Sequence, residues 1–295
     1  MSPSAASDRR EGLVRVIHSD YKQRVKDFWQ GRAEVYDANN TFHPPLCTHL
    51  VRVADLHKGS NVLDIATGTG HAAFAAADAV GPTGHVLGID ITESMLQQAK
   101  ARAAGTGKSN VEFQLGDAET ITLPDQIFDF ILCSNGMAYL QDIPAALKRF
   151  HGWLKPGGKL CFNNPLAPMM PLTETLITLC IEKFGVAPED AAVVLGTEDN
   201  IRAALTSAGF RHIQVTGTEE VKVSPNTMPA QFAENMFRMM ERFPAAPLSQ
   251  LLTHQQIEEL RSDYMAVAVP QAEALPQQDG GIVNQYVMLW AVATA

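Results

Sequence analysis

The chain contains, at residues 61–71, the sequence Asn61-Val62-Leu63-Asp64-Ile65-Ala66-Thr67-Gly68-Thr69-Gly70-His71. The apolar residues 62–65 predict a short strand, and the alanine-rich residues 71–80 predict a helix. Glycine between them lets the backbone approach a ligand closely, and the free N–H groups at a helix start point towards it. This stretch therefore predicts a strand, a glycine turn and a helix start that together bind a nucleotide.

Two classes of nucleotide are compatible with this turn. Residues 68–73, Gly-Thr-Gly-His-Ala-Ala, loosely fit the fingerprint of dinucleotide-binding dehydrogenases. The strand before the turn, however, carries Asp64, whose carboxylate would repel a pyrophosphate and suits a ligand with an amino group and a positive centre. The chain also has no evident Tyr-x-x-x-Lys pair for hydride chemistry. These features argue against an NAD(P)-dependent oxidoreductase, which stays as the alternative hypothesis for the function.

Further motifs follow, each beside a predicted strand. Residues 84–90 end in Asp90, about 20 residues past Gly70, where nucleotide-binding folds place the carboxylate that accepts the ribose hydroxyls. Thr92 can cap the next helix, and Met95 in it can cover an adenine. Residues 111–115 and 128–135 predict two more strands, and Leu-Lys-Pro-Gly-Gly at 154–158 predicts a turn into a fifth.

In this order the motifs resemble those of class I S-adenosylmethionine (SAM) methyltransferases. Asp64-x-Ala66-x-Gly68-x-Gly70 is similar to the first motif of the ubiquinone- and menaquinone-biosynthesis type of small-molecule enzyme, although Ala66 stands where that family usually has glycine. The run at 116–119, Gly-Asp-Ala-Glu, resembles a later motif of the family. The resemblance covers 64–162, roughly a third of the chain. Ser-Asn-Gly-Met at 134–137 replaces the (D/N)PPY motif of amine and nucleobase N-methyltransferases and argues against that branch.

The resemblance implies an α/β, Rossmann-like fold with a seven-stranded, mostly parallel sheet, and SAM as the cofactor. It places a tyrosine at Tyr36 against the cofactor, the acid Asp117 at the adenine amino group, and the next N–H at the ring. The cofactor-binding residues that we expect are Tyr36, Asp64, Ala66, Thr67, Gly68, Gly70, Asp90, Ile91, Met95, Asp117, Ala118, Glu119, Ser134 and Asn135.

Outside the motifs, helical patterns dominate. Apolar residues recur three and four apart between 13 and 36, a loop is expected at 36–45 and a short helix at 46–56. Two apolar stripes lie in the later insert, one through Phe232, Met236, Met239, Met240 and Phe243 and one through Leu251, Ile257, Leu260, Tyr264 and Val267. We therefore expect a disordered tail at 1–12, a helical cover at 13–57, the SAM-binding core at 58–222, a helical lid at 223–281, and the last strand of the sheet at 282–295.

The reaction implied is methyl transfer to a small, apolar acceptor, such as a quinone, isoprenoid or polyketide-like metabolite. Only a poor nucleophile needs a base. His43, Tyr139, His151 and Asn164 are candidates by position, with His43 preferred, and Glu174 is the candidate for stabilising a carbocation on an alkene acceptor. A plain loop histidine is the competing interpretation of His43. A SAM-binding protein that catalyses another reaction is the further alternative.

Composition limits the partners. The net charge of −9 argues against nucleic acid, because phosphate binding needs basic clusters. No apolar run of about 18 residues predicts a transmembrane segment. The four cysteines lie far apart without metal or redox spacing, so we expect buried free thiols, no metal, and a cytoplasmic enzyme. A small-molecule acceptor is the expected partner, and a homodimer is left open.

Overall fold

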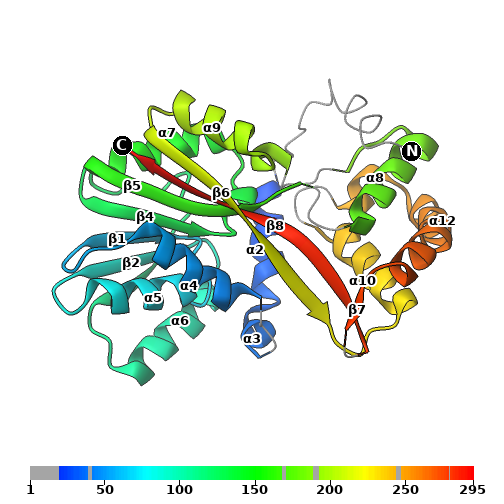
Figure 1. Cartoon of the computed structure of the whole chain (residues 1–295), viewed down its shortest axis with the longest axis horizontal. Coiled ribbons are helices and arrows are strands. Elements are labelled where there is room, and N and C mark those ends of the chain that lie inside the picture. Colours follow the sequence, from blue (N-terminus) through cyan, green and yellow to red (C-terminus); the bar gives the residue numbers. More distant parts are fainter. Residues whose placement is uncertain (1–19, 39–41, 168–170, 189–192, 244–246, 279) are drawn as a thin grey trace. The chain divides into compact units, whose positions relative to one another are not determined.

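The computed structural model describes residues 20–38, 42–167, 171–188, 193–243, 247–278 and 280–295. The predicted tail at 1–12 lies outside these residues. The chain divides into two compact units, whose elements are labelled in Figure 1. The sheet unit comprises Lys22–Ala167, Ala192–Thr218 and Val287–Ala295, and the helical unit takes Pro168–Ala191 and Glu219–Tyr286 together with the N-terminal residues through Tyr21.

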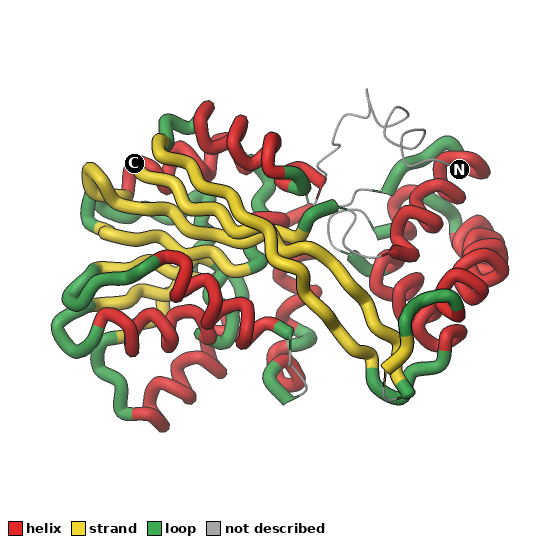
Figure 2. Tube along the Cα trace, viewed as in Figure 1, coloured by secondary structure: helices red, strands yellow, loops and turns green. Residues whose placement is uncertain are grey.

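A mostly parallel sheet forms along the order β3-β2-β1-β4-β5-β8-β6 (Figure 2). Strands β1 to β5 pair with one another in parallel, β8 is antiparallel to β5, and the two-residue β7 pairs with β8. The predicted α/β fold and its seven main strands are confirmed. The bounds are β1 Asn61–Ile65, β2 His85–Asp90, β3 Val111–Leu115, β4 Phe128–Ser134, β5 Leu154–Pro165, β6 Arg211–Ser224, β7 Gln277–Gln278 and β8 Gly281–Thr294.

The strand order reverses direction beside β1. Asp64 in β1 is paired with Gly88 of β2 on one side and with Leu132 of β4 on the other. Open α/β sheets bind ligands at such a switch point, outside the carboxyl ends of their strands. The register therefore brings together the glycine turn after β1, Asp90 at the end of β2 and Ser134 at the end of β4.

Helices cover the sheet because the strands of a parallel sheet bury both faces. Helices α4 and α5 pack on one another, α4 also on β4 and β5, and α5 on β1 and β2, while α7 packs on β5 and α9 (Figure 1). The bounds are α2 Tyr21–Gln30, α3 Ala33–Tyr36, α4 His43–Ala54, α5 His71–Val80, α6 Glu93–Thr106, α7 Ile143–Trp153 and α9 Glu198–Ser207, with short 3-10 turns η1 Met137–Tyr139 and η2 Val193–Leu195.

Three local predictions are wrong. His43 does not lie in a loop but begins α4, because proline at the next two positions is tolerated where helical N–H groups have no partner. The helix expected at 13–36 is divided, in its described part, into α2 and α3. Thr92 stands at the N-cap of α6, but its side chain makes no capping bond, and the carboxylate of Asp90 accepts its backbone N–H instead.

The helical unit has an apolar core of its own, formed by α8 Pro171–Phe184, α10 Pro229–Glu241, α11 Leu248–Leu251 and α12 His254–Glu273. Thr253 and Gln256 form a capping box at the start of α12. The predicted stripe residues Phe232, Met240, Ile257, Leu260 and Tyr264 are buried, and Met236 and Met239 pack against them. Val267 was expected in the same stripe, but 42% of its surface is exposed.

None of the described helices combines the length and the apolar character needed to cross a membrane.

Candidate active site

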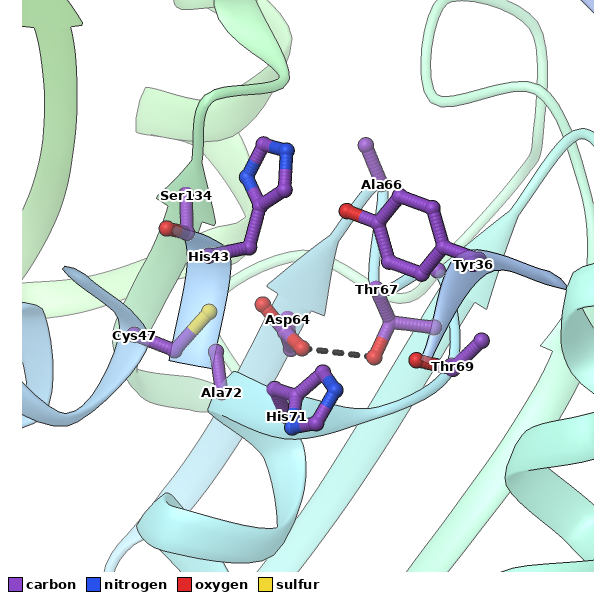
Figure 3. A pocket seen from close by; sticks show the side chains of 11 residues that line it. Tyr36, His43, Cys47, Asp64, Ala66, Thr67, Thr69, His71, Ala72 and Ser134 are labelled. Carbon is purple, nitrogen blue, oxygen red and sulfur yellow. Dashed lines mark hydrogen bonds between the residues drawn. The ribbon is translucent and has the colours of Figure 1, made fainter. Parts of the chain in front are cut away.

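A pocket lies where the glycine turn, the cover helices and the end of β4 meet, all within the sheet unit (Figure 3). Side chains from α3, α4, β1, the glycine turn, α5 and β4 face it. The lining residues are Tyr36, His43, Cys47, Asp64, Ala66, Thr67, Gly68, Thr69, His71, Ala72 and Ser134. Seven of these are residues that the sequence predicted for the site.

Backbone hydrogen bonds shape the glycine turn. The N–H of Gly70 donates to the carbonyl of Thr67 at 2.9 Å, and the N–H of Thr67 donates to Ile89 of β2 at 3.0 Å. Gly70 has a φ of 88°, which favours glycine, and an added Cβ would lie 2.8 Å from the ring of Phe74. Sequence and geometry therefore require glycine at this position.

Asp64 is the buried acid at the base of the pocket. It is 1% exposed, and its Oδ2 accepts a hydrogen bond from the hydroxyl of Thr67 at 2.6 Å. Burial raises the pKa of this carboxyl to about 7, because the charged form loses its hydration, and the Thr67 bond offsets only part of that effect. A cationic ligand would stabilise the charged form.

Asp90 ties two loops together. Its Oδ2 accepts the N–H of Gly68 and its Oδ1 accepts the N–H of Thr92, both at 2.8 Å. Burial raises its pKa, and these two bonds act against that rise. Each carboxylate oxygen can accept a second hydrogen bond, so the predicted contact with ribose hydroxyls is compatible with this arrangement.

Asp37 connects the cover to the glycine turn. Its Oδ1 accepts from the Thr69 hydroxyl at 2.9 Å and lies 2.8 Å from Nε2 of His71. The guanidinium of Arg102, which can only donate, lies 3.1 Å from Nδ1 of His71. Nδ1 therefore accepts, and Nε2 carries the hydrogen that His71 donates to Asp37.

Lys22 makes a second connection between the cover and the sheet. From α2 it donates to Asp117 at 3.1 Å and also pairs with Glu119. Glu119 further accepts the N–H groups of Gln141 at 2.9 Å and Asp142 at 2.6 Å. The carboxylate of Glu119 is thus committed to the protein itself, and its predicted contact with the cofactor stays a prediction.

The three catalytic candidates lie in different surroundings. The ring of His43 stacks on Tyr36, with centroids 5.4 Å apart, and its Nδ1 lies 3.3 Å from Nδ2 of Asn135. Tyr139 lies in η1 with its ring against Trp29. Glu174 lies in the first turn of α8, in the helical unit, so its role stays a prediction.

The remaining predicted residues are not among those that line the pocket. Met95 on α6 and Ala118 are 3% and 7% exposed, and each is packed in the protein interior. Ile91 directly follows Asp90. The contacts of Gly70, Asp90, Asp117, Glu119 and Asn135 are those given above.

Some residues at the site were not predicted from the sequence. Cys47, Thr69, His71 and Ala72 also line the pocket, while Lys22 and Asp37 hold the cover. The one available signal was position: Asp37 follows Tyr36 directly, and Thr69 and His71 belong to the glycine turn. All four cysteines are free and buried as expected, and burial raises the pKa of the Cys47 thiol to about 12.

Comparisons with known proteins agree with this fold. Residues 56–191 match a family model described as a methyltransferase domain. Nocamycin O-methyltransferase from Saccharothrix syringae is 32% identical over 197 residues, which cover 62% of this chain and 70% of that protein. Demethylmenaquinone methyltransferase from Staphylococcus epidermidis is 31% identical over 163 residues, covering 54% and 67%. The crystal structure of the YcgJ protein from Bacillus subtilis has the same fold, with a TM-score of 0.58 at 20% identity over 85% of this chain and 98% of that one.

Proposed function

Because this chain belongs to the family of SAM-dependent methyltransferases, we propose that it methylates a small, apolar acceptor of quinone, isoprenoid or polyketide type. Two relatives are named for nocamycin and demethylmenaquinone, which supports this class of acceptor. Membership of the family also decides against the NAD(P)-dependent oxidoreductase. SAM is the methyl donor.

The observation that carries the assignment is Asp64. A buried carboxyl whose pKa is raised to about 7, at the base of a pocket, gains most from a neighbouring positive charge. SAM has an ammonium group and a sulfonium, so the residues present fit it. Asp64 would hold the ammonium group, Asp90 the ribose, and Asp117 the adenine.

SAM supplies an electrophilic methyl group, whose bond to sulfur breaks as a lone pair of the acceptor bonds to the carbon. The protein has to hold the acceptor in line and exclude water. Tyr36 presents an aromatic ring to the pocket, and aromatic faces attract cations (Figure 3). In the helical unit the soft side chains Met236 and Met239 pack against its apolar core, and the predicted role of this unit as a lid stays a prediction.

Calorimetric titration of the full chain with SAM, S-adenosylhomocysteine and NAD tests the cofactor site. We expect micromolar binding of the two SAM-type ligands, lost in Asp90→Ala and weakened at least tenfold in Asp64→Asn. Asp78→Asn is the matched control, because Asp78 lies at the exposed end of α5 and should leave affinity unchanged. Binding of NAD without binding of the SAM-type ligands would overturn the assignment.

A mass-spectrometric screen tests the acceptor. The chain is incubated with SAM carrying a labelled methyl group and a panel of naphthoquinols, phenols and isoprenoid alcohols. A product with the labelled methyl identifies the class of acceptor. Binding of SAM with a product of unchanged mass would instead favour a reaction other than methylation.

A further inference from the structure

We propose that His43 acts as a hydrogen-bond donor and not as a general base, and that it selects acceptors whose reacting oxygen is already ionised. This proposal rests on the proposed function, since it concerns the acceptor of the same pocket. The observation behind it is a hydrogen-bond chain through Asn135 and Asn163 that fixes which nitrogen of His43 carries the hydrogen.

This series of hydrogen bonds starts at a backbone N–H, which can donate a hydrogen bond but cannot accept one. The backbone N–H of Asn135 lies 3.0 Å from Oδ1 of Asn163, so the amide oxygen of Asn163 must face it. Asn163 is on β5 and is fully buried. A reversed amide would set two donors against each other in a buried place, which costs free energy. Because Oδ1 of Asn163 faces this N–H, its Nδ2 must point to the other side of the amide.

The side-chain amide of Asn163 in turn orients the side-chain amide of Asn135. Nδ2 of Asn163 lies 3.5 Å from Oδ1 of Asn135, so the Asn135 oxygen faces Asn163. The Nδ2 of Asn135 then faces His43, 3.3 Å from Nδ1. An amide nitrogen donates and does not accept. Nδ1 of His43 must accept this bond, and in the neutral ring the hydrogen lies on Nε2.

The backbone and the neighbouring rings hold this arrangement. Asn135 has a φ of 54°, a left-handed conformation that asparagine tolerates better than most residues, and this conformation occurs directly after β4. The Tyr36 ring stacks on His43 with an interplanar angle of 25°, and Phe42 contacts the ring edge-on. His43 itself is the first residue of α4. The ring is thus fixed in position as well as in tautomer.

The tautomer limits the chemistry of His43. To accept a proton at Nε2, the neutral ring would need its hydrogen on Nδ1, where it would face the amino group of Asn135. With Nε2 protonated, the ring offers a donor to the pocket that it lines (Figure 3). Such a donor stabilises a negative oxygen through a charge-assisted hydrogen bond.

The class of acceptor follows. An acceptor that has lost its proton to solvent before binding needs no base, because methyl transfer to its oxygen leaves no proton behind. Phenols, enols and carboxylic acids that ionise near neutral pH fulfil this condition. Aliphatic alcohols do not, because they stay protonated and would need the base that His43 does not provide. We therefore expect ionised phenols and enols as substrates and unactivated alcohols as non-substrates.

NMR of the full chain with ¹⁵N-labelled histidine and bound S-adenosylhomocysteine tests the tautomer without any acceptor. Long-range ¹H–¹⁵N correlations distinguish the two neutral forms, and His43→Gln assigns the His43 signal among the nine histidines. We expect the hydrogen on Nε2. Asn135→Asp places a carboxylate opposite Nδ1 and should move the hydrogen there. Asn235→Asp, on the exposed side of α10, adds the same charge and should not. A hydrogen on Nδ1 in the unaltered protein would overturn the proposal.

A kinetic test uses substituted phenols of graded acidity as acceptors, with SAM. Tyr36, Cys47, Asp64 and His71 share the pocket with His43, so their titration should affect all phenols alike. We expect the pH midpoint of kcat/KM to move with the pKa of each phenol. His43→Leu should lower kcat/KM about 100-fold, and His43→Gln, which keeps a donor, should recover about tenfold of that loss.

A midpoint that is the same for every phenol, with the Gln and Leu variants equally inactive, would show that His43 is a base. If no phenol is methylated although SAM binds, the proposed class of acceptor fails, while the NMR result still decides the tautomer. If SAM does not bind, the proposed function itself fails. The three failures are therefore distinguishable.

Discussion

The glycine turn and the helical cover face the same pocket but are held in different ways. In the turn, Thr67 and Gly70 are fixed by backbone hydrogen bonds to near neighbours or to the adjacent strand. In the cover, Lys22, Asp37 and His43 are fixed by side chains that reach partners 95, 34 and 92 residues away. Main-chain hydrogen bonds to nearby residues thus shape the turn, and long-range side-chain contacts hold the cover.

The turn and the cover should therefore be sensitive to different kinds of substitution. A backbone-held turn is disturbed mainly when a new atom has no space or the dihedral angles are forbidden. A cover held through side chains is disturbed whenever one polar partner is removed, without damage to the sheet. Substitutions in the turn should therefore reduce stability, and those in the cover should reduce ligand affinity. Three experiments test this contrast.

The largest effect is expected for Gly70→Ala. The new Cβ would lie 2.8 Å from the ring of Phe74 and 2.9 Å from that of Phe113, at a φ of 88°. Backbone strain and overpacking together should lower the free energy of unfolding by about 2–4 kcal/mol, measured by urea denaturation. Gly107→Ala is the matched control, since its φ is 66° but no atom lies within 4 Å of the added Cβ. Equal losses in the two variants would show that the clash contributes nothing.

The second effect is a pH dependence centred on Asp64. Its carboxyl, with a pKa raised to about 7, is mostly neutral below that pH in the ligand-free protein, and a cation binds the charged form. As the pH is lowered below about 7, the affinity for SAM should therefore decrease by up to tenfold for each pH unit. Calorimetry measures this fall between pH 5.5, about 1.5 units below that pKa, and pH 8, about 1 unit above it.

Asp64→Asn is the control for this pH dependence. It should bind SAM weakly, with a flat profile in that range. The ligand-free protein should respond in the opposite sense, because an acid with a raised folded-state pKa contributes stability below its unfolded pKa and loses it as pH rises through about 7. A steep affinity profile that persists in Asp64→Asn would assign the titration to another group, such as Asp90.

The smallest effect is expected for Asp37→Ala. The variant loses the bonds to Thr69 and His71 that hold Tyr36, the preceding residue, beside the pocket. Because the Asp37 side chain is 43% exposed, the loss should be about 0.5–1 kcal/mol, or about two- to fivefold in SAM affinity. Asp27→Ala, which removes a carboxylate that accepts a hydrogen bond from Gln23 within α2, should leave affinity unchanged. A drop in urea stability larger than the loss of affinity would contradict the contrast between turn and cover.

The sequence predicted the sheet and the glycine turn well, because their signals are local. The helix at 71–80 and the strand at 111–115 have the bounds that the sequence indicated. Strand order then follows from the family motifs, and the parallel register brings Asp64, Asp90 and Ser134 to one edge. Each step needs only neighbours in sequence or a regular sheet.

The cover half could not be predicted in the same way. Nothing in residues 20–38 indicates that Lys22 meets Asp117, or that Asp37 accepts from His71, since these contacts exist only in the folded chain. The start of α4 was missed because two prolines suggested a loop, although they are compatible with a first helical turn. His43 was selected for the site, but its tautomer depends on Asn163, which no motif includes.

Ala66 has one more consequence, for the order in which this sequence can change. Its methyl group stands where many relatives of the motif have none, and a Cβ at Gly136 would lie 2.7 Å from that methyl carbon and 2.7 Å from Sγ of Cys133. The three positions are therefore coupled, so the effect of one substitution depends on the other two. A side chain at 136 is accommodated only if the atoms of Ala66 and Cys133 shift or become smaller. We therefore expect a substitution at 136 to be tolerated better after changes at 66 and 133 than before them.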